Sequence, residues 1–240
     1  MPKNPNWTRD ELILALDLYF SIESGEVHAN HPKVVKLSDL LNLLPIHSFR
    51  PDSLKFRNPN GVALKLNNFK SIDPAYHGKG MDRIGKLDKI VFDDFRSNRD
   101  ALAAVASRIR EVAADSSLRE DLKWITDEPT DPNSAKEGKV LQRLHKYRER
   151  NGNLARIKKD KTLAQRGCLA CEVCNFDFSA TYGDLGDGYI ECHHTTPLSE
   201  LSKETKTTIN DLALVCANCH RMLHRFSNLT LDELRSALRP

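Results

Sequence analysis

Two Cys-x-x-Cys pairs in the last third of this 240-residue sequence have the spacing of zinc ligands. Cys171 and Cys174 form the first pair, and Cys216 and Cys219 form the second. Thiolates three residues apart fit one tight turn, and two such turns supply the four ligands of a tetrahedral zinc site. The 41 residues between the pairs, 175–215, exceed the length of a typical zinc ribbon. We therefore predict a structural zinc that joins the two ends of an inserted element.

The other cysteines support this interpretation. All six cysteines lie between residues 168 and 219, and such clustering favours metal ligation in a reducing compartment over a secreted disulfide framework. Cys168 forms an alternative Cys-x-x-Cys with Cys171, but the pair 171/174 mirrors the second pair better. Cys168 and Cys192 are interpreted as ordinary small side chains. The residues MPKNPNWTRDE lack the apolar stretch of a signal peptide, and no apolar run is long enough to cross a membrane, so we expect a cytoplasmic protein without a membrane partner.

Four histidines accompany the cysteines. His193 and His194 are adjacent at the end of a short β-like run, and His220 and His224 share one face of the helix expected after Cys216. Adjacent strand residues point to opposite sides, so one of the first pair can help to hold a cation while the other acts on a phosphodiester. Hydrolysis of a phosphodiester needs a base to activate water and a divalent cation to stabilise the developing charge. The alternative is a structural zinc cluster without chemistry.

Two sequence segments carry these residues: ECHHTTPLSE (191–200) and LVCANCHRMLH (214–224). They resemble the HNH, or ββα-metal, endonucleases, and most closely the McrA-like restriction enzymes, and the resemblance covers about 168–226. It implies a DNA endonuclease of the prokaryotic cytosol with a structural zinc and a catalytic divalent cation. Such enzymes usually accept Mg, Mn, Co or Ni, and ligand geometry alone does not choose among these ions.

The resemblance also implies roles for single residues. His194 is the general base by this comparison. The middle asparagine of the family, which orients the base through backbone contacts, falls at Asp211 by its spacing, and Asn210, one residue away, is the alternative. The resemblance places three histidines around the catalytic cation: His193, His220 and His224. Of these, His220 also belongs to the predicted catalytic residues.

The first part of the sequence predicts helices. Thr8 and Glu11 form a capping box before the apolar run LILALDLYF, which we expect to be mostly buried. Further helices are expected at 34–44, 62–72, 86–97 and 100–114, the last with Asp100 as its N-cap. The helices at 34–44 and 62–72, joined by a turn, are typical of a helix-turn-helix arrangement.

The stretches WTRDELILALDLYF and RNPNGVALKLNNF are similar to the helical sulfur-binding domain found before HNH modules, over about 1–115. This similarity implies recognition of phosphorothioate-modified DNA. Sulfur is larger and less hydrated than oxygen, so a protein that recognises phosphorothioate would place apolar atoms beside the sulfur and cationic groups around them. The residues predicted to contact DNA are Arg57, Asn58, Lys65, Lys70, Tyr76, His77, Lys79 and Arg83.

Charge is unevenly distributed along the chain. The net charge is only +3, but residues 136–166 hold eleven Lys or Arg against three acidic residues, and residues 50–89 hold nine against four. Basic blocks are commonly solvated helix faces, but beside a nuclease motif they favour contact with phosphates. The prolines of TDEPTDPNS (126–134) indicate a domain boundary.

The sequence therefore predicts a mainly α protein in three parts: a helical DNA-recognition domain at 1–130, a basic helical linker at 131–166 and a zinc-stapled HNH domain at 167–240. The predicted function is modification-dependent, type IV-like cleavage of double-stranded DNA, with phosphorothioate as the leading target. The alternatives are cleavage of 5-methylcytosine or 5-hydroxymethylcytosine DNA, a homing or phage-packaging HNH enzyme that cuts unmodified DNA, and an inactive zinc-stabilised DNA-binding regulator. One HNH module nicks one strand, so a double-strand break suggests a homodimer.

Overall fold

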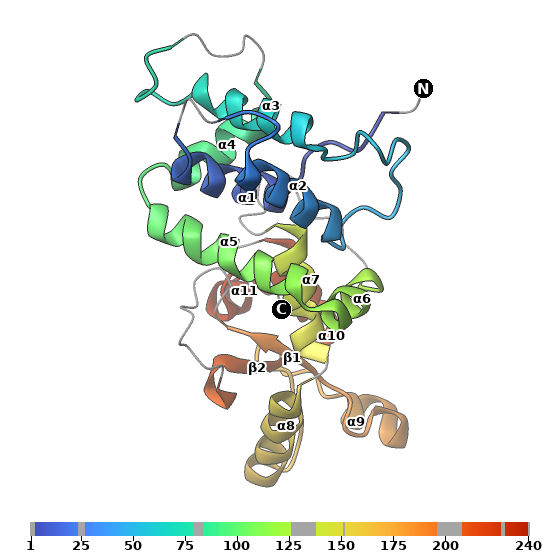
Figure 1. Ribbon diagram of the computed structural model, residues 1–240. Coiled ribbons are helices and arrows are strands. Elements are labelled where there is room, and N and C mark those ends of the chain that lie inside the picture. Colours follow the sequence, from blue (N-terminus) through green and yellow to red (C-terminus); the bar gives the residue numbers. More distant parts are fainter. Residues whose placement is uncertain are drawn as a thin grey trace. The chain divides into compact units, whose positions relative to one another are not determined.

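The computed structural model is described for residues 3–23, 27–78, 84–125, 138–150, 152–195, 208–226 and 229–239. Over these residues the protein is mainly helical, with helices α1 to α11 and one two-stranded sheet (Figure 1), which confirms the predicted fold class. The chain divides into two compact units. One consists of Met1–Trp124 and Gly138–Leu141, and the other of Ile125–Glu137 and Gln142–Pro240. Among the described helices, none has the length and apolar character needed to cross a bilayer.

The first unit is built around α1 (Arg9–Ser21). Apolar residues occupy almost every position of its central turns, and residues 10–16 and 18 are all buried. Leu12, Leu14 and Leu16 are completely buried. α1 contacts four helices of this unit (Figure 1): α2 (Pro32–Leu43), α3 (Pro59–Lys70), α4 (Lys86–Phe95) and α5 (Arg99–Ala114). The short helix α6 (Ser116–Lys123) follows α5.

The helix starts follow their prolines and caps. Pro32 and Pro59 lie in the first turns of α2 and α3, where a missing backbone N–H costs nothing, so both helices begin earlier than expected. At α5 the expected N-cap was wrong. The side chain of Asn98 accepts a hydrogen bond from the backbone N–H of Ala101 at 3.0 Å, and Asp100 lies inside the first turn.

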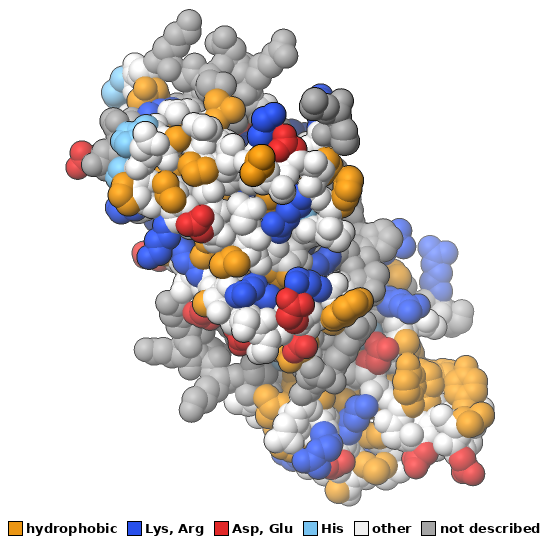
Figure 2. All heavy atoms as spheres, turned by 45° about the vertical axis from the view of Figure 1, so that its right-hand side comes forward, with side chains coloured by type: hydrophobic (Ala, Val, Ile, Leu, Met, Phe, Trp, Pro, Cys, Tyr) orange, Lys and Arg blue, Asp and Glu red, His pale blue; other side chains and the backbone are white. Residues whose placement is uncertain are grey.

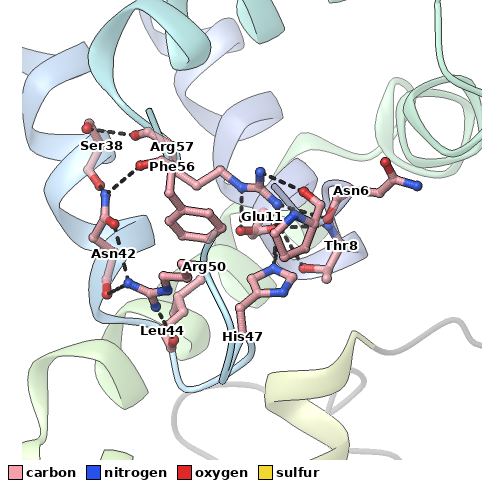
Figure 3. A network of polar contacts seen from close by, with 11 residues as sticks. Asn6, Thr8, Glu11, Ser38, Asn42, Leu44, His47, Arg50, Phe56 and Arg57 are labelled. Atoms are coloured by element: carbon pink, nitrogen blue, oxygen red, sulfur yellow. Dashed lines mark hydrogen bonds and ion pairs between the residues drawn. The ribbon is translucent and has the colours of Figure 1, made fainter. Parts of the chain in front are cut away.

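A buried ion pair joins α1 to the turn before α3 (Figure 3). Arg57 donates from Nε to Glu11 Oε1 at 2.7 Å and from Nη2 to Glu11 Oε2 at 2.9 Å. It also donates to the carbonyl oxygens of Pro5 and Asn6. Burial raises the pKa of Glu11, but hydrogen bonds from His47 and Arg57 outweigh it and hold the pKa below its usual value. The pair thus keeps a buried carboxylate ionised.

This arrangement corrects the prediction that Arg57 contacts DNA. Its side chain is 4% exposed and its guanidinium is engaged with Glu11, so it is not available to a phosphate. Lys65 is corrected for the same reason. Its Nζ lies 2.8 Å from Asp88 Oδ2, and the two side chains are 13% and 3% exposed. Both cations neutralise buried carboxylates, which is a structural role.

Asp10 is a second buried carboxyl group of the first unit. It is completely buried, and its Oδ1 accepts a hydrogen bond from the backbone N–H of Val140 at 3.2 Å. Burial is the main cause that raises the pKa of Asp10 to about 7, and the repulsion of Glu11 adds to it, while backbone hydrogen bonds lower it. The folded state therefore holds a proton at Asp10 at pH values where the unfolded chain, with a pKa near 3.8, has lost it.

We expect this proton to make the first unit less stable as the pH rises from about 4 through 7, because ionising Asp10 in the folded state costs on the order of 4 kcal/mol. An Asp10→Asn variant keeps an oxygen acceptor for Val140 and removes the titration, so its free energy of unfolding should stay nearly level over this range. Urea unfolding at several pH values, followed by helical circular dichroism, measures the difference. Asp39→Asn, which removes an exposed carboxylate, is the control. Parallel profiles for wild type and Asp10→Asn would contradict the prediction.

The second unit contains most of α7 (Lys139–Arg150), α8 (Asn153–Arg166), the short α9 (Phe178–Tyr182), η2 (Gly183–Gly186), η3 (Ile209–Asp211) and α11 (Leu231–Ala237). Its centre is a ββα motif. Strand β1 (Glu191–His194) pairs antiparallel with β2 (Leu212–Val215), and α10 (Ala217–Arg225) follows directly (Figure 1). A hydrophobic core that includes Leu214, Val215 and Leu223 holds the motif together.

Candidate metal centres

Four cysteines form one cluster, as predicted. Cys216 is the N-cap of α10 and Cys219 lies in its first turn, while Cys171 and Cys174 flank a turn of the chain before α9. The four Sγ atoms lie within 4.8 Å of one another, and those of Cys174 and Cys216 are 3.7 Å apart. The first turn is closed by a hydrogen bond from the N–H of Asn175, at φ 60°, to the carbonyl of Cys171 at 2.9 Å. Asparagine tolerates this left-handed conformation.

The protonation of these thiols suits a bound cation. Burial raises the pKa of Cys171, but backbone N–H groups of Cys174, Cys216 and Val173 outweigh it and lower the pKa. Burial raises the pKa of Cys219, and the neighbouring thiols Cys174 and Cys216 raise it further. Four thiolates this close together repel one another, and a bound cation would compensate that repulsion. A set of four sulfur donors fits zinc, which can serve here as a structural ion.

The histidines form a second cluster on the same ββα motif. β1 supplies His193 and His194, which are 8% and 7% exposed, and α10 supplies His220 and His224. The ring centroid of His193 lies 5.0 Å from that of His224 and 5.2 Å from that of His220. The structure thus brings together the three histidines that were predicted to surround a cation.

A fifth histidine, His145 of α7, belongs to this cluster and was not predicted. One ring nitrogen each of His145, His193 and His224 lie within 4.8 Å of one another, close enough to share a metal ion. The His145 ring also stands edge-on to that of His194, with centroids 5.2 Å apart. The signal in the sequence was helical spacing: Leu141 and Leu144 fix the buried face of α7, and residue 145 falls on that face.

Glu191 orients the cluster from the start of β1. Its Oε2 lies 2.6 Å from Nδ1 of His220, so His220 can donate its Nδ1 proton to the carboxylate and keep a lone pair on Nε2. Nε2 of His220 in turn lies 2.9 Å from Nε2 of His224. A carboxylate behind a histidine is the usual outer-shell partner of a metal-binding imidazole. The donor chemistry of the cluster therefore fits a divalent cation.

Residues 171–226 match the family model of the HNH endonucleases. The matched segment begins at Cys171, the first of the clustered cysteines, and contains β1, β2 and α10 with four of the five clustered histidines. The second unit contains an HNH domain. Comparisons with curated proteins and with solved structures found no match for the chain.

Within the HNH domain, Asp211 is the residue that faces the end of β1. Its carbonyl oxygen accepts hydrogen bonds from the N–H of Thr195 at 2.9 Å and from the Thr195 hydroxyl at 3.2 Å, directly after His194. Its carboxylate accepts from the N–H and hydroxyl of Thr208, which lowers the pKa of Asp211. Asn210 is exposed, and its N–H donates to Thr208. Asp211 therefore has the backbone contact expected of the middle position.

A basic groove lies beside the histidines of the HNH domain. It has a volume of about 430 Å³, and Glu191, His220 and His224 line its floor together with residues of α7 and α8. We name it the basic groove for the four cations in its lining: Lys146, Arg156, Lys159 and Arg221. Three of these cations, Lys146, Arg156 and Lys159, come from the basic segment 136–166, and cations beside convergent histidines suit a phosphodiester.

The remaining predicted DNA contacts lie in the first unit. Asn58 caps α3 by accepting a hydrogen bond from Gly61. Lys70, at the end of α3, has its Nζ 5.4 Å from the centre of the Tyr76 ring, and burial lowers its pKa. His77 is exposed in the loop after α3, while Lys79 and Arg83 lie outside the described residues. On the face shown in Figure 2, Lys and Arg side chains are interspersed with hydrophobic and acidic ones.

Proposed function

We propose that this protein is a metal-dependent DNA endonuclease that hydrolyses phosphodiester bonds at the ββα motif of its HNH domain. The observation that carries the proposal is the coincidence of the family match with a buried histidine cluster beside the basic groove. A zinc-stabilised binding protein would need the cysteines, but it would have no evident use for five clustered histidines, three of which bring ring nitrogens within 4.8 Å of one another.

His194 is the proposed general base. It is held at the end of β1, where the backbone contact between Thr195 and Asp211 fixes the chain immediately after it. A ring nitrogen of His194 takes the proton of the attacking water. His193, His220 and His224 would hold the catalytic cation, which supplies the charge that stabilises the pentavalent phosphorus and the leaving oxygen. Mg, Mn, Co and Ni are the candidate ions.

The basic groove is the proposed site for the DNA backbone. Arg156 and Lys159 of α8 lie one helical turn apart, and the Nζ of Lys159 is 3.4 Å from the carbonyl oxygen of Gly188. Each lysine or arginine that pairs with a phosphate releases a counterion, so binding through this groove should weaken steeply as salt is added.

We expect an Arg156→Ala/Lys159→Ala variant to bind duplex DNA roughly tenfold more weakly near 100 mM salt and to lower the slope of log K against log salt by about 1 to 2. Fluorescence anisotropy of a labelled duplex at several salt concentrations measures both effects. Lys161→Ala is the matched control, because Lys161 lies on the same helix but outside the lining of the groove. Equal slopes for wild type and the double variant would remove the groove from the DNA-binding surface.

We further propose that the first unit directs the nuclease to modified DNA, with phosphorothioate as the leading target. The support is the loop after α3. Lys70 is partly desolvated beside the Tyr76 ring, and Pro74 and Ala75 expose apolar atoms next to them. A cation set among apolar atoms suits a soft, weakly hydrated anion better than it suits an ordinary phosphate oxygen.

Cleavage of three matched plasmids tests the proposal: unmodified, cytosine-methylated and phosphorothioated, each with Mg and with Mn. Cutting of the phosphorothioated plasmid alone is the expected result, and Tyr76→Ala should then reduce cutting of that plasmid. Cutting of the methylated plasmid alone would keep the nuclease and replace the proposed target. Cutting of unmodified DNA would contradict modification dependence. Binding without cutting under every condition would favour a DNA-binding regulator.

The same assay bears on assembly. One HNH domain cuts one strand, so we expect nicked circles at low protein concentration. Linear product that rises more steeply than the first power of protein concentration would support a homodimer as the form that breaks both strands.

A further inference from the structure

His145 is the histidine of the cluster that lies outside the HNH match. It is carried by α7, where Leu141 and Leu144 form the buried face and are 0% and 5% exposed. His145 is one turn beyond Leu141 and is itself 6% exposed. Leucine would fill this position without the desolvation cost of an imidazole, so a buried histidine here needs a polar reason.

The neighbours of His145 include two further histidines of the cluster. Its ring centroid lies 5.9 Å from that of His193 and 5.2 Å from that of His224. Two imidazoles bound to one ion through nitrogen–metal bonds of about 2.1 Å have centroids about 5 Å apart, which is close to these separations. The three rings come from α7, β1 and α10, so three separate elements direct a ring nitrogen towards one point.

We propose that His145 is a ligand of the catalytic cation, so that the metal centre of this protein includes α7 as well as the HNH segment. This inference rests on the proposed function, because it concerns the cation of the same nuclease site. Adding an imidazole to His193 and His224 makes the donor set rich in nitrogen. Imidazole suits Co and Ni, whereas Mg prefers oxygen donors, so the wild-type site should bind Co and Ni at least tenfold more tightly than Mg.

The first test measures, by calorimetry, the binding of Co²⁺ to the full chain with zinc retained at its cysteines. We expect His145→Ala to weaken Co²⁺ binding by roughly 10- to 100-fold or more, since even outer-shell partners of a ligand have effects of that size. Arg143→Ala, two residues earlier on the opposite side of α7, is the matched control and should bind as wild type does. Zinc content and helical circular dichroism report whether each variant is folded.

A second variant tests directly whether residue 145 coordinates the cation. In His145→Cys, a thiolate that binds Co²⁺ adds a sulfur-to-cobalt charge-transfer band in the near ultraviolet, while Arg143→Cys adds none. Appearance of the band in His145→Cys alone supports the proposal, even if His145→Ala does not fold. A folded His145→Cys without the band, or wild-type Co²⁺ affinity in His145→Ala, overturns it. If wild type itself binds no Co²⁺, Ni²⁺, Mn²⁺ or Mg²⁺ outside the cysteines, it is the proposed metal-dependent function that fails.

Discussion

Replacing His194 with glutamine is expected to reduce DNA nicking by roughly 10²- to 10⁴-fold, the usual contribution of a general acid or base. Glutamine has a volume near that of histidine and can fill the buried position at the end of β1, but its amide cannot take a proton from water near neutral pH. The measurement is the rate of conversion of supercoiled plasmid to nicked circle at saturating Mn²⁺, using the substrate that the wild type cuts best.

Two controls make this result specific to the base. His28→Gln changes an exposed histidine of the first unit and should leave the rate as it is in wild type. Zinc content and Co²⁺ affinity of His194→Gln should stay near the wild-type values, because His194 is not assigned to either metal. A variant that keeps both metals and still nicks at more than a tenth of the wild-type rate would exclude His194 as the base.

Replacing Cys219 with serine is expected to unfold the second unit. Cys219 is 6% exposed, belongs to the hydrophobic core and anchors the first turn of α10, where its N–H donates to Cys216 Sγ at 3.5 Å. A structural zinc site contributes roughly 10 kcal/mol or more to folding, which exceeds what a small core can replace. The variant should hold no zinc, and limited proteolysis should digest the second unit while the first persists.

Cys168→Ser is the matched control for this experiment. Cys168 is exposed, whereas the four clustered cysteines have their Sγ atoms within 4.8 Å of one another, so its replacement should leave zinc content and thermal unfolding unchanged. Removing zinc from the wild type with a strong chelator should reproduce the behaviour of Cys219→Ser. A Cys219→Ser protein that resists protease as the wild type does would show that the cysteines are not a structural staple.

Much of the fold could be predicted because local sequence and tertiary structure agree. The apolar run of α1 was expected to be mostly buried, and it is. The starts of α2 and α3 were expected at residues 34 and 62, but they lie at Pro32 and Pro59. Helix α6 was not predicted, because only Leu122 of its residues is buried and the apolar repeat is too short to read. Its start is set instead by the Asp115 side chain, which accepts from Leu118.

The site shows the same division. The cysteine cluster was predictable because two Cys-x-x-Cys pairs have the spacing of metal ligands, and the four clustered histidines of β1 and α10 lie within one motif. His145 was not predicted because it lies 26 residues before Cys171, in a basic segment whose composition is typical of a solvent-exposed helix. Arg57 and Lys65 were assigned to DNA because a sequence shows charge but not its partner. Their carboxylates, Glu11 and Asp88, are 46 and 23 positions away.

The close approach of Cys174 and Cys216 has a consequence for handling the protein. Their sulfur atoms are 3.7 Å apart, and each belongs to a different Cys-x-x-Cys turn. In metal-free protein exposed to air, dioxygen can take two electrons from this pair and leave a disulfide that crosses between the turns. The oxidised form would keep the turns tethered but would have lost two zinc ligands. A preparation that is aerated before it is metallated should therefore resist zinc until a reductant is added.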